Sequence, residues 1–151
     1  MSYHIAQLNI GRMAGPVDAP VMEGFVARLD EINALADSAP GFVWRLQTED
    51  GDATSIRAFD DPLLLVNLSV WDSIESLHEF TYRSDHRELL RARKQWFQRS
   101  TGPYMVMWWV PAGHTPTLDE AKNRLDTLVK HGPTSEAFTF AQRFDQPTQD
   151  E

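Results

Sequence analysis

The chain has 151 residues, a formal net charge of −8 and no cysteine. This length predicts one domain with a proper core, and the missing cysteines exclude disulfides and thiolate metal sites. The acidic charge argues against nucleic acid and anionic membranes as partners. The N-terminal residues resemble no signal peptide, and no apolar run approaches the roughly 20 residues that cross a bilayer, so we expect a cytoplasmic protein.

The first half of the chain predicts a strand, a helix and a second strand. Alternating side chains indicate a strand over residues 3–10, and apolar residues at helical spacing indicate a helix over residues 22–36. A short strand is expected over residues 42–47. The acidic segment 48–62 then reads as a long hairpin connection that carries an Asp50-Gly51 turn signal.

The second half predicts two strands that are buried on both faces. These are residues 63–71 and the entirely apolar run 104–110. Between them, Asp72 and Glu75 form a capping box for a helix that we expect to break near Arg83. Thr117 and Glu120 cap another helix, which ends at residue 132 and precedes a short strand over residues 137–140. We expect one domain over residues 1–144 and a frayed tail over residues 145–151.

This order of elements predicts an α+β fold, a ferredoxin-like βαββαβ plait with an extra C-terminal helix and short strand. The plait has an antiparallel sheet of about four strands with the helices on one face. Because the middle strands are apolar on both sides, the helix-free face also needs a cover. A second copy of the chain is the simplest cover, so we predict a homodimer that pairs sheet against sheet.

Several segments give the chain a family resemblance: VNLSVWDSIESL, YRSDHRELLRARKQWF, WWVPAGHTPT, EAKNRL and GPTSEAFTF. They resemble a bacterial family described as a domain of unknown function, which is similar to the dimeric α/β-barrel superfamily. That superfamily includes antibiotic-biosynthesis-type monooxygenases, haem-degrading enzymes, muconolactone isomerases and structural proteins. The resemblance implies the fold and the dimer, and it implies no single chemistry.

The resemblance also bears on haem. The positions that line up with the helix tryptophan and the iron-binding histidine of the haem-degrading enzymes are Phe80 and about Leu90 or Arg91, so that pattern is not kept. Asn9 lines up with their asparagine. Haem therefore remains a weaker alternative to a cofactor-free protein.

Three polar residues at intervals of four, His78, Tyr82 and His86, share one face of the predicted helix. We expect them to line a cavity between helix and sheet, together with Trp96 and strand residues such as Asn67, Ser69, Trp108 or Trp109. Such a site is mostly apolar with a few polar groups. Alternatively, the histidines and the tyrosine only lie at the rim of the core, with the apolar parts of their side chains buried and their polar ends in solvent.

Each of these residues has an expected role. Imidazole titrates near neutrality, so His86 is the first choice for a general base and His78 the second. Tyr82 and Asn67 then orient the substrate or stabilise an oxyanion. His114 either caps the mouth of the cavity or lies in an exposed loop, and Arg45 either holds a carboxylate or lies at a sheet edge.

Three functions follow from these patterns. The first is a cofactor-free monooxygenase-like or isomerase-like enzyme that acts on a small apolar or aromatic substrate. The second is a non-catalytic ligand-binding or structural dimer, and the third is a haem-binding protein. A dedicated metal is not expected, because the spacing of His78, Tyr82 and His86 brings no carboxylate to the same face.

Overall fold

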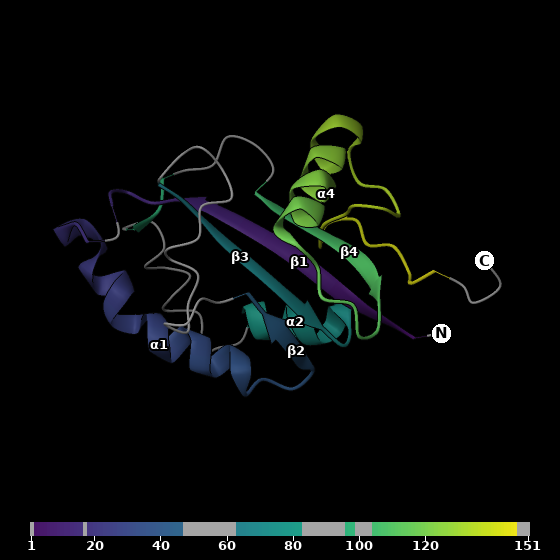
Figure 1. Ribbon diagram of the computed structural model, residues 1–151, viewed down its shortest axis with the longest axis horizontal. Helices are drawn as coiled ribbons and strands as arrows, with labels where there is room; N and C mark the ends of the chain where they lie inside the picture. Colours follow the sequence, from purple (N-terminus) through teal and green to yellow (C-terminus); the bar gives the residue numbers. More distant parts are fainter. Residues whose placement is uncertain (1, 17, 47–62, 83–95, 99–103, 148–151) are drawn as a thin grey trace.

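A four-stranded antiparallel sheet forms the centre of the molecule (Figure 1). The computed structural model describes residues 2–16, 18–46, 63–82, 96–98 and 104–147. The strands lie in the order β2-β3-β1-β4. Their bounds are Tyr3–Arg12 for β1, Phe42–Arg45 for β2, Leu64–Trp71 for β3 and Met105–Pro111 for β4.

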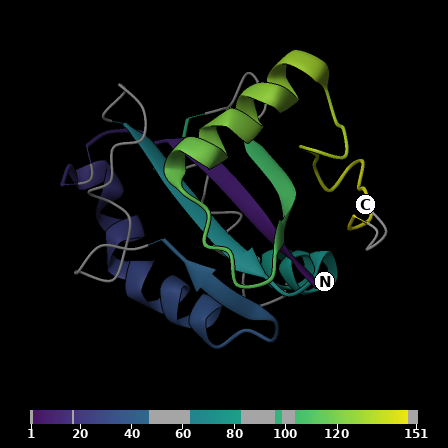
Figure 2. The same cartoon turned by 45° about the vertical axis from the view of Figure 1, so that its right-hand side comes forward.

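Helices lie on both sides of this sheet. A 3-10 turn, η1 (Pro20–Met22), leads into α1 (Glu23–Asp37), and α2 (Ile74–Tyr82) follows β3. The C-terminal helix is α4 (Leu118–His131). Figure 2 shows α4 lying across the strands on one side, whereas α1 and α2 lie away from it. The strand order and the βαββαβ sequence confirm the predicted α+β plait.

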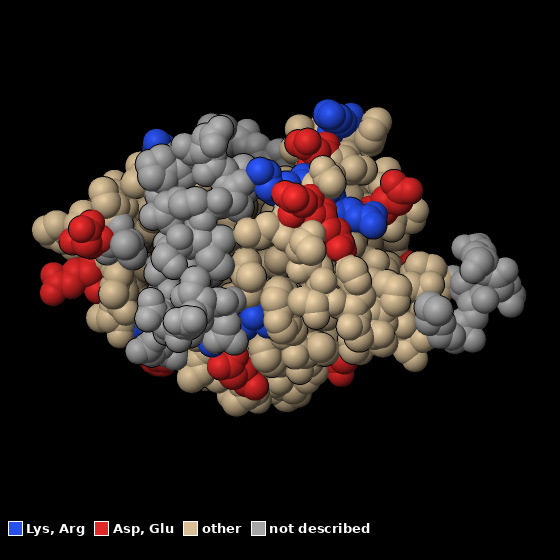
Figure 3. Space-filling view, in the orientation of Figure 1, with Lys and Arg blue, Asp and Glu red and all other residues tan. Residues whose placement is uncertain are grey.

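We call the side of the sheet under α4 the α4 face. It is continuously apolar and buries Ala6, Leu8, Val66, Leu68, Val70, Val106, Trp108 and Val110 against α4. α4 contributes Ala121, Leu125 and Leu128, which recur at helical spacing and so form one stripe. Its outer surface carries acidic and basic side chains, which gather over α4 in Figure 3. This division between buried and charged sides is what fixes α4 on the sheet.

We call the opposite side the α2 face. Because side chains alternate along a strand, it carries Ile5, Gln7 and Asn9 of β1 and their partners Trp71, Ser69 and Asn67 of β3. One apolar cluster on this side, which we call the Trp71 cluster, includes Trp71, Ile74, Leu77, Met107 and Phe138. A second, which we call the Trp96 cluster, includes Met13, Met22, Phe25 and Trp96.

The prediction that all helices cover one face is therefore wrong. The sequence indicated an amphipathic third helix, and it is this helix that packs on the face expected to be bare. The predicted last strand is also absent from the described residues. Instead Phe138 forms a single antiparallel bridge with Met107, with N–O distances of 2.8 and 2.9 Å in the two directions.

Two local details position α2 behind β3. The cap of α2 is Ser73 rather than the predicted Asp72, because Ser73 Oγ accepts a hydrogen bond from the Ser76 backbone N–H at 3.1 Å. Gly41 precedes β2 with a φ of 85°. A Cβ at Gly41 would collide with the Asp72 and Ser76 side chains, so glycine permits the close approach of this turn to the start of α2.

Several predictions fall outside the described residues. These are the hairpin over residues 48–62, the helix break near Arg83, and the positions of His86, Leu90 and Arg91. Within the described part of the chain, no helix combines the length and apolar character that crossing a bilayer requires.

Candidate functional site

The centre of the α2 face carries polar side chains. Gln7 of β1 stands opposite Ser69 of β3, and Asn9 stands opposite Asn67. Gln7 is 4% exposed and Ser69 is 6% exposed, whereas Asn67 is exposed. Burying an amide or hydroxyl costs free energy unless it is hydrogen-bonded, so this group requires an internal network.

That network is continuous, and we call it the Asn67 network. Trp71 Nε1 donates to Ser69 Oγ at 2.9 Å. Gln7 Nε2 donates to the same Ser69 Oγ at 2.7 Å and to Asn67 Oδ1 at 2.6 Å. Both amide hydrogens of Gln7 are thereby used. The network runs from a buried indole to an exposed amide along one face of two adjacent strands.

The network determines what Asn67 presents outward. Its Oδ1 accepts from Gln7, so its Nδ2 group is turned away from the strand pair as a donor. Within the described ranges, no group accepts a hydrogen bond from Asn67 Nδ2. An oriented donor between apolar clusters suits a carbonyl or oxyanion oxygen of a ligand.

Aromatic rings flank the network on the α2 side. The Trp71 ring packs against Phe80 at a centroid distance of 5.0 Å and an angle of 31°, and against Phe42 edge-on at 5.4 Å. In the other cluster, Phe25 contacts the Trp96 ring at 5.7 Å. The polar centre therefore lies between two aromatic clusters, an arrangement that offers apolar surface to a planar molecule.

The two neighbouring tryptophans of β4 point to opposite faces. Trp109 lies on the α2 face, opposite Ile5, and its Nε1 donates to the Phe144 carbonyl oxygen at 2.9 Å. Trp108 is fully buried on the α4 face, where its Nε1 donates to Glu120 Oε2 at 2.9 Å. The structure thus excludes Trp108 from a site shared with Asn67, because adjacent residues of a strand cannot face the same way.

His114 lies beside Trp108 on the α4 face. Its Nε2 is 2.7 Å from Glu120 Oε1, and its side chain is 44% exposed. Burial by itself raises the pKa of Glu120, but the hydrogen bonds from His114 and Trp108 and the nearby charges of His114 and Arg124 outweigh it, so the pKa is lowered. His114 therefore joins the turn after β4 to α4, and it does not close the mouth of a site at Asn67.

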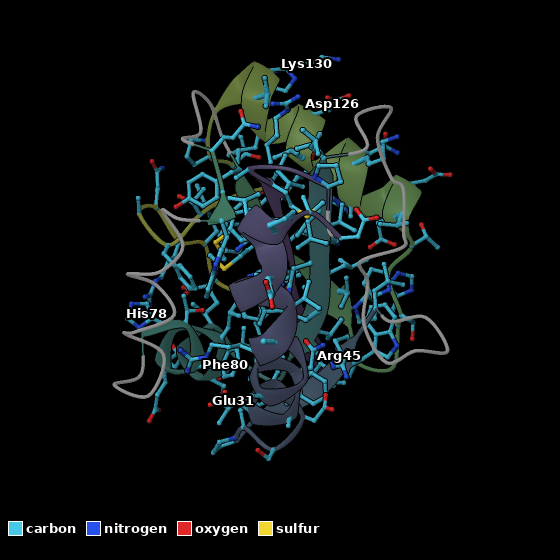
Figure 4. The ribbon with its side chains drawn as sticks, turned by 90° about the vertical axis from the view of Figure 1, so that its left-hand side faces the viewer. Glu31, Arg45, His78, Phe80, Asp126 and Lys130 are labelled. Atoms are coloured by element: carbon cyan, nitrogen blue, oxygen red, sulfur yellow. The ribbon has the colours of Figure 1, made fainter. Side chains whose placement is uncertain are left out.

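Arg45 and His78 lie on opposite sides of α1 in Figure 4. Arg45 forms a two-contact salt bridge with Asp37 at the end of α1, with Nε–Oδ1 and Nη2–Oδ2 distances of 2.7 and 3.3 Å. Its guanidinium thus fixes α1 to β2, which disagrees with a carboxylate-binding role in the cavity. His78 contacts the edge of Phe140 at a centroid distance of 5.1 Å.

The remaining predicted residues divide between two groups. Trp96 is buried in the Trp96 cluster beyond Asn67 on the same side of the sheet. Tyr82 ends α2, and its side chain lies outside what the structure describes, as does the whole of His86. Among the described residues, no cluster of three or more His, Asp or Glu side chains is arranged to hold a metal ion.

Two members of the Asn67 network were not predicted, Gln7 and Trp71. The signal was present, because a glutamine inside an apolar strand must find partners, and alternation places it on the same face as Asn9. What the sequence lacked was the register of β1 against β3. That register brings Gln7 to Ser69 and turns two separate polar positions into one site.

Comparison with known proteins supplies the family. Residues 4–151 match the family described as "Domain of unknown function (DUF3291)". The chain belongs to this family. The DUF3291 assignment confirms the resemblance found in the sequence. The description of the family names no reaction. No curated protein matches the chain.

Solved structures similar to this DUF3291 chain include SnoaB, a cofactor-independent oxygenase from Streptomyces nogalater. It is 15% identical with a TM-score of 0.47, and the match covers 76% of this chain and 97% of SnoaB. Another is PA3566 from Pseudomonas aeruginosa, at 12% identity and a TM-score of 0.48, which covers 73% of this chain and 94% of PA3566.

Proposed function

We propose that this DUF3291 protein is a cofactor-free monooxygenase-like enzyme whose substrate binds at Asn67 on the α2 face. The observation that carries the proposal is the Asn67 network, which orients an exposed amide donor at the centre of an aromatic face. If this face of the sheet only packed against other elements, apolar residues at positions 7 and 69 would make the protein more stable. Retaining a hydrogen-bonded polar network there is typical of a binding site.

The chemistry uses an electron-rich phenol or enol as the substrate. Loss of its O–H proton gives an anion that reacts with O2 directly, and Asn67 Nδ2 donates to the oxygen that carries the negative charge. For 2-naphthol the balance is C10H8O + O2 → C10H6O2 + H2O. The substrate supplies all four electrons, one oxygen atom enters the quinone, and the other leaves as water.

The general base in this proposal is His86, with His78 as the second candidate and Tyr82 as a further donor. The Trp71 and Trp96 clusters supply apolar surface on either side of Asn67. An isomerase-like proton transfer uses the same base and the same donor, so the two reactions differ only in whether O2 is consumed.

Oxygen uptake with 2-naphthol tests the proposal. The wild-type protein is expected to consume O2 with the appearance of quinone absorbance, and Asn67→Ala is expected to lower kcat by roughly 100-fold, as does removal of one oxyanion donor in other enzymes. Asn123→Ala is the matched control, an exposed asparagine of α4 on the other side of the sheet.

Equal rates for Asn67→Ala and wild type would contradict the proposed site. Binding of 2-naphthol without any O2 uptake would favour the alternative of a non-catalytic ligand-binding protein. A panel of other bicyclic phenols and enols, together with mass spectrometry of small molecules that co-purify with the protein, extends the same test to the unknown substrate.

The homodimer remains a prediction. The uncovered apolar surface that motivated this prediction is smaller than expected, because α4 covers much of that face. On that face, Ile10 of β1, Trp44 of β2 and the following Leu46 are only partly buried. Sedimentation equilibrium at micromolar concentration would measure a mass of two chains if this side is paired, and one chain if it is not.

A further inference from the structure

We infer that Gln7 is a positioning residue that sets the polarity of Asn67, so that the site selects ligands presenting a hydrogen-bond acceptor rather than a donor. This inference rests on the proposed function, because it concerns the ligand of the same site. Gln7 itself is only 4% exposed and acts on a ligand through Asn67.

The surroundings of the Gln7 amide determine its orientation. An asparagine or glutamine side chain can be turned end for end with little change in shape, so only fixed neighbours determine which end is nitrogen. The fixed neighbour here is the backbone oxygen of Asn67, which lies 3.4 Å from Gln7 Nε2. A carbonyl oxygen cannot donate, so it attracts a nitrogen at this position and repels an oxygen.

The orientation of Gln7 then determines that of Asn67. Gln7 Nε2 lies 2.6 Å from the Asn67 side chain and can only donate, so Asn67 accepts with Oδ1 and its Nδ2 points outward. Ser69 Oγ holds the second hydrogen of Gln7 Nε2 at 2.7 Å and is itself held by Trp71 Nε1 at 2.9 Å. Ser69 Oγ thus fixes the position of the Gln7 amide, and the backbone oxygen of Asn67 fixes which end of it is nitrogen.

Burial makes this polarity persistent. Gln7, Ser69 and Trp71 are 4%, 6% and 1% exposed, so water cannot readily substitute for a lost partner. Turning Asn67 over would set its Nδ2 against Gln7 Nε2, so that two donors face each other, and a buried donor left unpaired costs about 1–3 kcal/mol. The exposed end of Asn67 thus stays a donor, and it binds a ligand oxygen that carries no hydrogen and can only accept.

Three bicyclic probes of similar size test this selectivity. 1-Indanone presents only a carbonyl acceptor, indole presents only an N–H donor, and indene presents neither. We expect wild type to bind 1-indanone about tenfold more tightly than indole or indene, as one well-oriented hydrogen bond gives. Affinities are measured by NMR titration, with the side-chain amide signals of Asn67 and Gln7 as reporters.

The Gln7→Glu variant gives the sharpest result. At pH 8 a carboxylate at this position can only accept, so Asn67 turns its Nδ2 inward and exposes Oδ1. The preference should then invert, with indole bound more tightly than 1-indanone. Gln7→Met fills the same space without hydrogen bonds and is expected to bind the two probes about equally. A purely structural Gln7 would weaken both probes alike in Gln7→Glu, and that result would overturn the inference.

The wild-type protein offers a test that does not depend on the folding of a variant. Both side-chain amide hydrogens of Gln7 should exchange slowly with water, and those of Asn67 should exchange fast and shift on adding 1-indanone. Slow exchange at Asn67 would overturn the inference. Normal turnover of 2-naphthol with no selectivity between the probes removes the inference alone, whereas clear selectivity without O2 uptake removes only the oxygenase proposal.

Discussion

The two faces of the sheet are built from the same strands, yet one is apolar throughout and the other is polar at its centre. The α4 face buries alternate residues such as Leu8, Leu68 and Val106 against one amphipathic helix, and its polar contacts lie at the margin, at Glu120 and His114. The α2 face has the reverse arrangement, with polar residues at its centre and apolar clusters at its ends.

This contrast shows how one short sheet can place the residues that stabilise the fold on one face and the residues that contact a ligand on the other. Successive residues of β3, Leu68 and Ser69, belong to different environments because the pleat alternates. Changes on the α4 face should therefore act mainly on the free energy of unfolding. Changes at the centre of the α2 face should act on ligand binding, with a smaller effect on stability.

The largest expected effect on stability is that of Trp108→Ala on the α4 face. Trp108 is fully buried and hydrogen-bonded to Glu120, so the substitution should lower the free energy of unfolding by about 3–5 kcal/mol. Urea denaturation followed by circular dichroism measures this. Trp109→Ala is the matched variant on the partly buried α2 side and should cost less; a larger loss for Trp109→Ala would break the comparison.

Ser69→Ala tests the internal support of the Asn67 network. Removal of Ser69 Oγ leaves the Trp71 and Gln7 donors without this buried acceptor, so we expect a loss of about 1–3 kcal/mol, together with weaker binding of 1-indanone. Ser38→Ala, at an exposed serine directly after α1, serves as the control and should change neither quantity appreciably. Unchanged stability for Ser69→Ala would mean that the network is not formed in solution.

The acid side of the stability profile should report on Glu120. Because the pKa of Glu120 is lower in the folded state than in the unfolded chain, its contribution is fully present above the unfolded value and is lost as the pH falls through the folded one. Glu120→Gln should therefore flatten the loss of stability below about pH 4.5, the region of an ordinary glutamate. Urea midpoints between pH 3 and pH 7 check this, and an identical acid slope in both proteins would contradict it.

Arg45→Ala should have the smallest effect. Its salt bridge joins the Arg45 side chain, 12% exposed, to that of Asp37, 49% exposed, and a pair with one partner in solvent contributes about 0.2–1 kcal/mol. The expected result is a small loss of thermal stability with unchanged turnover of 2-naphthol. A fall in turnover without a fall in stability would instead assign Arg45 to the substrate, as the sequence first suggested.

The sequence predicted the plait because its signals are local. Alternation along β1 and β3, the T-x-x-E cap at Thr117 and the apolar run of β4 each specify an element without reference to the rest of the chain. The side on which α4 packs is not a local property. An amphipathic helix has an apolar stripe whichever face of the sheet it covers. The face predicted to be free of helices is therefore the one that α4 covers.

The candidate site was predicted in part for the same reason. Asn67 was predicted as a lining residue, whereas the periodic spacing of His78, Tyr82 and His86 placed the predicted base on the helix. The partners of Asn67 depend on pairing between strands more than 50 residues apart, which no pattern in either strand specifies. Trp108 was drawn into the site because an apolar run conceals the alternation of its faces.

An anaerobic NMR titration with 2-naphthol tests the central claim most directly, since ligand contact can then be read separately on the two faces. The account predicts that the largest shifts fall on the side chains of Asn67, Gln7 and Trp71, while backbone signals of Ala121 and Leu125 in α4 stay in place. Shifts concentrated in α4, or no saturable shift at Asn67, would contradict it.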